Sequence, residues 1–311
     1  MTELSIIIPI YNEEQNILPL YTRLKKVAER ISPSHELLFI NDGSRDRSIE
    51  LIRDLAVKDN AVKYINFSRN FGHQIAVTAG LDHTKGEAVV IIDADLQDPP
   101  ELIAEMYAKM KEGFQVVYAK RRSRSGESFL KKYTAKKFYR ILAKITSISI
   151  PVDTGDFRIM DKRVVEVLRH MPEQQKFLRG QISWIGFNQT YVEYDRGERH
   201  AGDTGYTYKK MIRFALDGIT SFSNLPLKFA TAMGFLVSII TFFVSIYALY
   251  SRFISKSYVP GWTSLMLAVM FIGGVQLICI GIIGEYISRL SANVRNRPLY
   301  IMSDSNIHNN Q

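Results

Sequence analysis

Two long stretches near the C-terminal end of the sequence contain no charged residue. The first covers 229–250 and has 22 residues, and the second covers 262–284 and has 23. A helix rises about 1.5 Å per residue, so each stretch can cross the roughly 30 Å hydrocarbon core of a bilayer. Buried helices of soluble domains, the alternative, rarely stay uncharged over that length. The sequence therefore predicts two transmembrane helices.

Charges beside these stretches predict their orientation. Arg252 and Lys256 lie between them, and more basic residues lie on the other side: Lys209, Lys210, Arg213, Lys228, Arg289, Arg295 and Arg297. Cytoplasmic loops are the ones enriched in Lys and Arg. The first residues carry acidic flanks and a short apolar run ended by Pro9, unlike a secretory signal. We expect a multi-pass protein of the inner (cytoplasmic) membrane with both termini in the cytoplasm.

The N-terminal part alternates two kinds of apolar pattern. Short β-branched or aromatic runs occupy 4–9, 36–41, 62–67, 88–92 and 114–119, and helical patterns occupy 13–30, 45–58, 73–84 and 100–112. This alternation is typical of βαβ units and predicts an α/β fold with a mostly parallel, Rossmann-like sheet covered on both faces.

These patterns divide the chain into four parts. We expect a cytoplasmic domain over 1–205, an interfacial amphipathic segment over 206–228, a two-helix transmembrane domain over 229–290 and a cytoplasmic tail over 291–311. The second part places apolar residues near helical spacing beside basic ones, as helices at a membrane surface do. The large domain would thus lie against the inner leaflet.

Polar residues follow each of the first four predicted strands. They are Tyr11-Asn12-Glu13, Asn41-Asp42-Gly43-Ser44, Ser68-Arg69-Asn70-Phe71-Gly72 and Asp93-Ala94-Asp95. Ligands of parallel sheets bind beyond the carboxyl ends of the strands, so these segments together predict a pocket. Neither GxGxxG nor GxxxxGK[ST] occurs, which argues against dinucleotide and P-loop sites.

Asp93 and Asp95 suggest a metal site. Alternate residues of a strand share a face, so both carboxylates could point into the pocket, whereas Asp98 and Pro99 would begin the next helix. Grouped carboxylates repel one another unless a cation compensates them. Mg²⁺ or Mn²⁺ fits, because such ions bind one or two carboxylates together with substrate phosphates. Helix capping alone is the competing explanation.

Basic residues are concentrated between Lys111 and Arg140, where ten stand against two acidic ones. Such a run is typical of a solvated helix face or of a surface that binds phosphates of lipid or nucleic acid. Two membrane helices and an acidic strand edge argue against nucleic acid.

The segments IIIPIYNEEQNI, INDGSRDRS, RNFGHQIAVTAGLDHTKGEAVVIIDADLQDPPE and TGDFRIMDKRVVEVL, followed by the two apolar stretches, resemble an inverting GT-A glycosyltransferase. The branch is that of the polyisoprenyl-phosphate glycosyltransferases. The sequence is similar to dolichol-phosphate mannose synthases and closer to bactoprenol glucosyltransferases of the GtrB type. The resemblance extends over essentially the whole chain.

This resemblance implies site residues. Those that would hold the nucleotide sugar are Pro9, Tyr11, Asn12, Glu13, Asp42 at the base, Arg69, Gly72 and Asp93. Asp93 and Asp95 would form the DxD pair that binds Mg²⁺ or Mn²⁺, with Asp95 the direct ligand and Gln97 a third. Asp156 in GDFR would be the catalytic acidic residue near the reacting centre, although an ordinary ion pair with Arg158 stays open.

For the acceptor phosphate the resemblance implies Arg121, assisted by Lys131 or Lys132. Relatives often read AGESKY before the membrane, whereas this chain reads AGDTGY over 201–206 and lacks the lysine. Arg199 or His200 could replace that contact.

The implied reaction is transfer of a hexose, best assigned as glucose from UDP-glucose, to polyprenyl (undecaprenyl) phosphate with inversion, for modification of a cell-envelope glycan. The acceptor oxygen is already anionic, so Asp156 should orient more than it deprotonates. Two alternatives stay open: a processive polysaccharide synthase and a non-catalytic membrane-anchored binding protein. Processive synthases usually contain a QxxRW motif, and QISW at 181–184 does not match it. Whether the protein is a homo-oligomer is not decided by the sequence.

Overall fold

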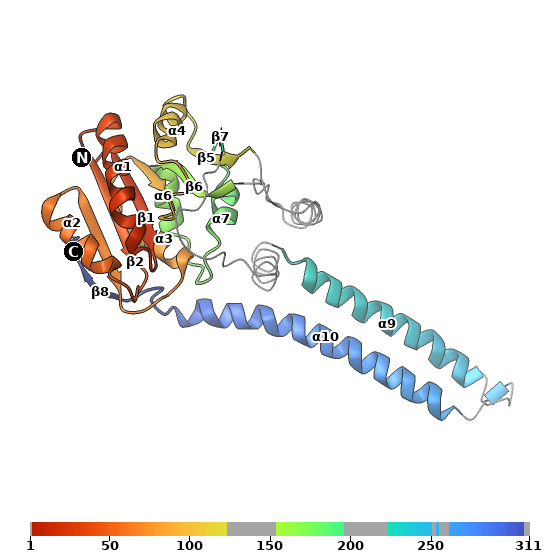
Figure 1. Ribbon diagram of the computed structural model, residues 1–311. Helices are drawn as coiled ribbons and strands as arrows, with labels where there is room; N and C mark the ends of the chain where they lie inside the picture. Colours follow the sequence, from red (N-terminus) through yellow and green to blue (C-terminus); the bar gives the residue numbers. More distant parts are fainter. Residues whose placement is uncertain (1, 123–153, 196–222, 251–252, 255–260, 308–311) are drawn as a thin grey trace.

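The structure is a computed structural model that describes residues 2–122, 154–195, 223–250, 253–254 and 261–307. Its N-terminal elements form a layered domain, and two long helices reach away from that domain side by side (Figure 1). The last described residues return from the second helix to the layered domain. The first and the last described residues therefore lie on the same domain.

One eight-stranded sheet forms the middle layer, in the order β7-β5-β6-β4-β1-β2-β3-β8. Its strands are β1 (Leu4–Ile10), β2 (His35–Asn41), β3 (Val62–Phe67), β4 (Ala88–Ile91), β5 (Val116–Arg121), β6 (Thr154–Asp161), β7 (Gln189–Tyr194) and β8 (Met302–Ser305). Strands β1 to β4 are parallel, as are β5 and β7, whereas β6 runs antiparallel to β4 and β5. The predicted α/β class with a mostly parallel sheet is confirmed.

Helices cover both faces of the sheet. On one face lie α1 (Glu14–Ile31), α2 (Ser48–Lys58) and α4 (Leu102–Lys111), and on the other lie α3 (His73–His83), α6 (Lys162–Arg169) and α7 (Leu178–Ile185). The pleat of β1 explains the arrangement, because Ile6 and Ile8 pack in the first layer and Ile7 in the second. Sheets buried on both faces need such continuous apolar strands.

The start of α4 differs from the sequence prediction. The helix begins at Leu102 rather than at Pro99, after a turn in which the Leu102 amide donates to the Pro99 carbonyl. The Asp98 carboxylate, expected to begin the helix, instead accepts a hydrogen bond from the Tyr194 hydroxyl. The two residues are far apart in the sequence, so no pattern around Asp98 predicts this contact.

Part of the predicted cytoplasmic tail, 291–311, belongs to the sheet. Strand β8 pairs antiparallel with β3 and covers that edge. The Asp304 carboxylate accepts hydrogen bonds of 2.8 Å from both Arg53 and Asn66. The segment that follows the second long helix is thereby fastened to the layered domain.

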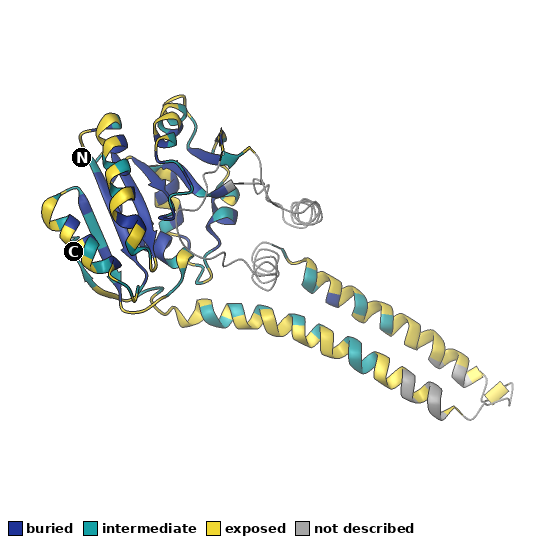
Figure 2. Ribbon diagram, viewed as in Figure 1, coloured by how far each residue is buried: buried dark blue, intermediate teal, exposed yellow. Residues whose placement is uncertain are grey.

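The two long helices are α9 (Leu225–Tyr250) and α10 (Trp262–Arg295). Within them, Leu225–Val244 and Ala268–Arg295 are apolar and long enough to cross a membrane. Large apolar side chains such as Phe235, Phe242 and Leu277 are exposed along the helices (Figure 2). Contiguous exposed apolar surface of this extent marks a membrane or partner interface, and the protein is membrane-associated. Of the predicted interfacial segment 206–228, residues 206–222 lie outside the described residues.

Candidate active site

The candidate site lies at one edge of the sheet, where the carboxyl ends of the parallel strands meet. Because β6 runs antiparallel to β4, its first residues reach the same edge as the last residues of β4. Asp156, early in β6, therefore comes close to Asp93, which follows β4. The ring Nε2 of His73, at the start of α3, lies 3.6 Å from Asp93 Oδ1 and 3.2 Å from Asp156 Oδ2.

Asp93 has one carboxylate oxygen, Oδ1, that is buried and accepts no hydrogen bond within the described part of the chain. Burial raises the pKa of Asp93 to about 6; the charge on His73 opposes the shift, and the carboxylates of Asp156, Asp98 and Asp95 add to it. A carboxylate in this environment gains from a cation that compensates its charge. Asp93 thus has the character of a ligand-binding rather than a structural residue.

Asp95 is held by a sharp turn. Its Oδ1 accepts a hydrogen bond of 3.1 Å from the Gln97 amide, and Leu96 between them has a φ of 59°. A leucine in the left-handed region is strained, and such strain persists where the surrounding structure holds a functional turn in place. Asp95 and Gln97 are thereby kept together at the sheet edge.

Asp156 is the centre of a charged network. Its Oδ1 accepts hydrogen bonds from Arg179 Nε at 2.9 Å and from Arg158 Nη2 at 3.1 Å, and Gln74 Nε2 lies 3.5 Å from its Oδ2. Burial alone would raise the pKa of Asp156, but the two arginines and His73 outweigh it and hold the pKa well below its usual range. The carboxylate stays ionised, which suits orientation better than proton transfer.

Arg158 forms the buried floor of this network. Only 1% of it is exposed, and it donates to the backbone carbonyls of Gly155 and Asp156 while its guanidinium lies 5.2 Å from the centre of the Tyr118 ring. The ion pair that the sequence left open for Asp156 exists. It is shared with Arg179 and His73, however, so Asp156 joins β6 to α3 and α7.

The loops that follow β1 and β2 are joined through Asn12, whose φ is 56°. The Asn12 amide donates to Ser44 Oγ at 3.0 Å, and its side-chain oxygen accepts from the Arg45 amide at 2.8 Å. The neighbouring Glu13 amide donates to Ser48, and Tyr11 is exposed. These predicted nucleotide residues form one surface at the sheet edge.

Asp42 fixes the loop that follows β3. Its carboxylate accepts hydrogen bonds from the amides of Phe71 at 2.6 Å and Gly72 at 2.9 Å. The contact of Asp42 with the base of the nucleotide stays a prediction. Gly43 has a φ of 65°, and a Cβ there would lie 2.4 Å from the carbonyl carbon of Arg69. Only glycine allows the two loops to approach so closely.

Two other members of the predicted nucleotide set differ in exposure. The Arg69 guanidinium lies 3.9 Å from the centre of the Phe71 ring at the surface, whereas Pro9 is buried within β1. Any contribution of Pro9 to a ligand therefore comes through the backbone it holds. The contact of Arg69 with the nucleotide sugar stays a prediction.

Arg121, predicted to bind the acceptor phosphate, ends β5 beside the site. Its Nε donates to the Tyr194 hydroxyl at 3.2 Å, and its Nη2 lies 3.9 Å from Asp98 Oδ1. The other predicted acceptor residues, Lys131, Lys132 and Arg199, lie outside the described residues, as does His200.

Comparison with known proteins decides the family. The model of Glycosyl transferase family 2 matches residues 5–169, and that of the GtrB C-terminal hairpin matches residues 225–290. The chain belongs to glycosyltransferase family 2. The loops and carboxylates described above are thus the candidate active site of a glycosyltransferase.

Several relatives match this glycosyltransferase over nearly its full length. An uncharacterized glycosyltransferase, YkcC, of Bacillus subtilis is 52% identical over 97% of this chain and 93% of its own. A prophage-derived bactoprenol glucosyl transferase of Shigella flexneri is 42% identical over 97% and 98%, and a prophage bactoprenol glucosyl transferase homolog of Escherichia coli is 41% identical over 96% and 98%.

Among solved structures, glucosyl-3-phosphoglycerate synthase from Mycobacterium tuberculosis, in complex with Mn²⁺, UDP and phosphoglyceric acid, is similar with a TM-score of 0.48 and 16% identity. The match covers 70% of this chain and 76% of that one.

The side chains that could bind a divalent cation in this glycosyltransferase are too few to do so without a substrate. Among the described residues, no group of three or more His, Cys, Asp or Glu side chains is close enough to hold a metal ion. Asp93 and Asp95 nevertheless offer two carboxylates, one with an unsatisfied buried oxygen. Mg²⁺ commonly takes one or two carboxylates and completes its shell with phosphates and water.

The sequence prediction omitted three residues of the site: His73, Gln74 and Arg179. His73 and Gln74 could have been found, because they follow the polar loop after β3 and begin a helix at the sheet edge. Arg179 lies 23 positions beyond Asp156 in the first turn of α7, and nothing in its neighbourhood predicts the contact.

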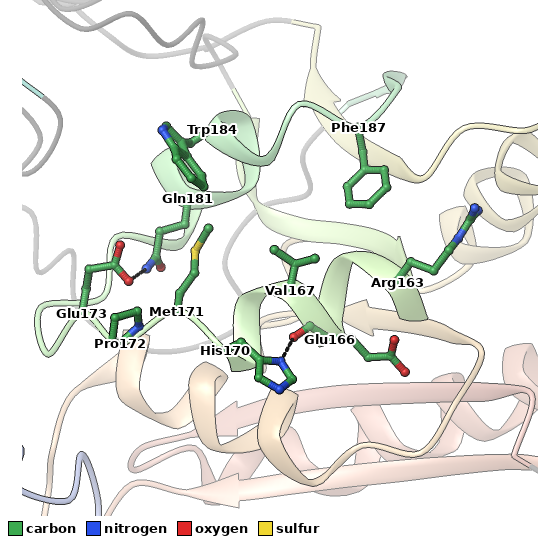
Figure 3. Close-up of a pocket in the computed structure, with 10 residues that line it drawn as sticks. All are labelled: Arg163, Glu166, Val167, His170, Met171, Pro172, Glu173, Gln181, Trp184 and Phe187. Carbon is green, nitrogen blue, oxygen red and sulfur yellow. Dashed lines mark hydrogen bonds between the residues drawn. The ribbon is translucent and has the colours of Figure 1, made fainter.

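A cavity of about 780 Å³ lies elsewhere, between α6 and α7 (Figure 3). Residues from the two helices and from the segments that follow them line it: Arg163, Glu166, Val167, His170, Met171, Pro172, Glu173, Gln181, Trp184 and Phe187. None of the predicted site residues within the described part of the chain lines this cavity, which is therefore distinct from the carboxylate cluster at the sheet edge.

Proposed function

We propose that this glycosyltransferase moves glucose from UDP-glucose to a polyprenyl phosphate, with inversion at C1, at the cytoplasmic face of a membrane. The observation that carries the proposal is the meeting of Asp93, His73 and Asp156 at the sheet edge of a chain with a two-helix membrane hairpin. The relatives named bactoprenol glucosyl transferase support the lipid acceptor and the sugar.

The reaction requires little acid–base chemistry. An oxygen of the acceptor phosphate attacks C1 of the glucose and forms the new C1–O bond, while the bond from C1 to the diphosphate breaks and UDP leaves with its electron pair. The attacking oxygen is already anionic, so no proton has to be removed. Asp156, held ionised by Arg158 and Arg179, would orient the sugar and disfavour binding of the acceptor in a wrong position.

Asp93 and Asp95 would hold Mg²⁺ or Mn²⁺, with Gln97 beside them. Such an ion supplies positive charge to the diphosphate as negative charge builds on it. The protein's part is to hold Asp95 beside Gln97 through the strained turn at Leu96.

The membrane hairpin would keep the sheet edge near the lipid headgroups. Basic residues are more frequent on the side of the sheet domain than between the helices, which supports a cytoplasmic domain and two cytoplasmic termini. The basic segment from Lys111 to Arg140 would attract the acceptor phosphate and the anionic leaflet. Among the members that the structure describes, Arg121 contacts Tyr194 and Asp98, which supports a position near the acceptor.

The decisive experiment uses the full chain reconstituted in vesicles that contain undecaprenyl phosphate. The vesicles are incubated with radiolabelled UDP-glucose, GDP-mannose or UDP-N-acetylglucosamine in turn, and the lipid is extracted. We expect label in a lipid-phosphate sugar with UDP-glucose and the β-linked product by NMR. Label in a long water-soluble polymer would instead indicate a processive synthase, and the absence of any labelled product would contradict the proposal.

A further inference from the structure

The C-terminal end of α10, which is the cytoplasmic end under the proposed function, contacts a segment that leads directly into the candidate active site. The Gln174 amide donates to Asn293 Oδ1 at 3.0 Å, and its side-chain nitrogen lies 3.4 Å from Asn296 Oδ1. Beside it, Arg289 of α10 donates to the side-chain oxygen of Gln175. A membrane helix is therefore hydrogen-bonded to residues just before α7.

The first turn of α7 makes the contacts with the site. Arg179 donates to Asp156, and the Leu178 amide donates to Gln74 Oε1 at 3.4 Å while Gln74 Nε2 lies 3.5 Å from Asp156. Only three residues separate Gln175 from Arg179 in the chain. A shift of residues 174–175 would therefore displace Arg179 and, through Leu178, Gln74, two side chains that contact Asp156 from α7 and α3.

The other side of the segment is not tightly packed. Met171, Pro172 and Glu173 border the cavity between α6 and α7, where Glu173 accepts a hydrogen bond of 3.2 Å from Gln181 (Figure 3). Residues that border open space are held by fewer contacts than residues of a close-packed interior, whose side chains have few alternative positions. The cavity leaves room on this side for residues 171–173, and α10 holds the next two residues, Gln174 and Gln175.

The end of α10 is itself fixed to the sheet domain. The helix ends at Arg295, and shortly after it the ring of Tyr300 stacks on Phe67 with centroids 5.1 Å apart. The Tyr300 hydroxyl also lies 3.1 Å from both His83 Nε2 and Asp82 Oδ2 at the end of α3. Tyr300, just beyond α10, thus contacts the C-terminal end of α3. Residues 174–179 connect α10 itself to the candidate site, where α3 begins.

We propose that the cytoplasmic end of α10 positions Asp156 through Gln174 and Gln175, with Arg179 and Gln74 as the positioning residues that contact it. The inference rests on the proposed function in that Asp156 acts in sugar transfer. Its consequence is that the membrane hairpin contributes to the rate of transfer as well as to anchoring.

The test compares the full-length wild type with a double variant, Asn293→Ala with Gln175→Ala, in lipid vesicles. We expect kcat for transfer from UDP-glucose to undecaprenyl phosphate to fall about tenfold, because small displacements of oriented groups are costly. The KM for UDP-glucose should not change. Val294→Ala, an exposed neighbour on the same helix, should behave as the wild type, and Asn293→Asp, which keeps an acceptor oxygen, should retain most of the rate.

Hydrogen exchange measured by mass spectrometry provides a readout that does not depend on activity. We expect faster exchange of amides 172–180 in the double variant and unchanged exchange in β2. If β2 also exchanges faster, the single variant Gln175→Ala replaces the double one. An unchanged kcat in an active enzyme, or unchanged exchange at 172–180, would overturn the inference. A wild type inactive with every donor would refute the proposed function, and exchange alone would then decide the inference.

Discussion

The His73 ring meets the Asp156 carboxylate at the sheet edge, with Nε2 3.2 Å from Oδ2, although 83 positions separate the two residues. Burial disfavours the charged ring, but the hydrogen bond with Asp156 and the charges of Asp93 and Asp156 outweigh it and raise the pKa of His73 to about 9. A positive ring between two carboxylates reduces the repulsion that would otherwise separate them.

Replacing His73 should therefore impair transfer. We expect His73→Ala to lower kcat about a hundredfold, the typical cost of removing one electrostatic contact at a reacting centre. His73→Gln, which keeps a donor toward Asp156 but no charge, should lose less. Initial rates of labelled lipid formation measure both. His170→Ala is the control, since that ring bonds only to the Glu166 carbonyl on α6 among the described residues; full activity of His73→Ala would contradict the assignment.

Removal of the metal should abolish transfer if Asp95 is a ligand. We expect EDTA to stop product formation and Mg²⁺ or Mn²⁺ to restore it, because one or two carboxylates bind such ions weakly enough for a chelator to compete. Asp95→Ala should be inactive at every metal concentration while it still folds and inserts into membranes, as shown by circular dichroism and membrane fractionation. A fully active Asp95→Ala enzyme would rule out the metal assignment.

Local pattern and long-range contact explain what the sequence did and did not predict. The strands and helices around Asp93 follow from apolar periodicity, and the convergence of loops follows from parallel pairing. By contrast, β8 reads MSDS, a polar run without alternation, and becomes a strand by pairing with β3, where Asn66 and Arg53 also bind Asp304. The contact of Arg179 with Asp156 likewise depends on how α7 packs, which no short segment specifies.

Acid should remove one contribution to the stability of the sheet domain. Burial opposes ionisation of Asp59, but hydrogen bonds from Lys25, Tyr21 and the Ala61 amide outweigh it and lower the pKa to about 2. In the unfolded chain the pKa is about 3.9, so the contribution is complete above pH 4 or so and is lost as the pH falls through the folded value.

Thermal unfolding of the wild type and of Asp59→Asn, in the same detergent, checks this expectation. The wild type should have the higher Tm at pH 6, and the difference should shrink between pH 4 and pH 2. A difference that stays constant over this range would show that the ionised carboxylate does not contribute. Glu50→Gln, at an exposed ion pair with Arg47, is a matched control with little expected effect at any pH.

Arg121 should distinguish the acceptor from the donor. Its guanidinium is held beside the site by Tyr194 and Asp98, and a fixed guanidinium binds phosphate through several charge-assisted hydrogen bonds. We expect Arg121→Gln to raise the KM for undecaprenyl phosphate about tenfold, as loss of one charged hydrogen bond does, and to leave the KM for UDP-glucose unchanged.

The matched control for Arg121→Gln is Lys120→Gln, which removes the same charge from the next residue of β5. Lys120 pairs with Glu193 at 3.0 Å and lies 4.1 Å from the centre of the Tyr191 ring, whereas Arg121 contacts Tyr194 and Asp98. General attraction to an anionic leaflet would weaken equally in both variants, so a selective effect of Arg121→Gln would indicate direct contact with the acceptor phosphate. Equal increases in the KM for lipid would instead assign Arg121 to the membrane surface, and a raised KM for UDP-glucose would assign it to the donor.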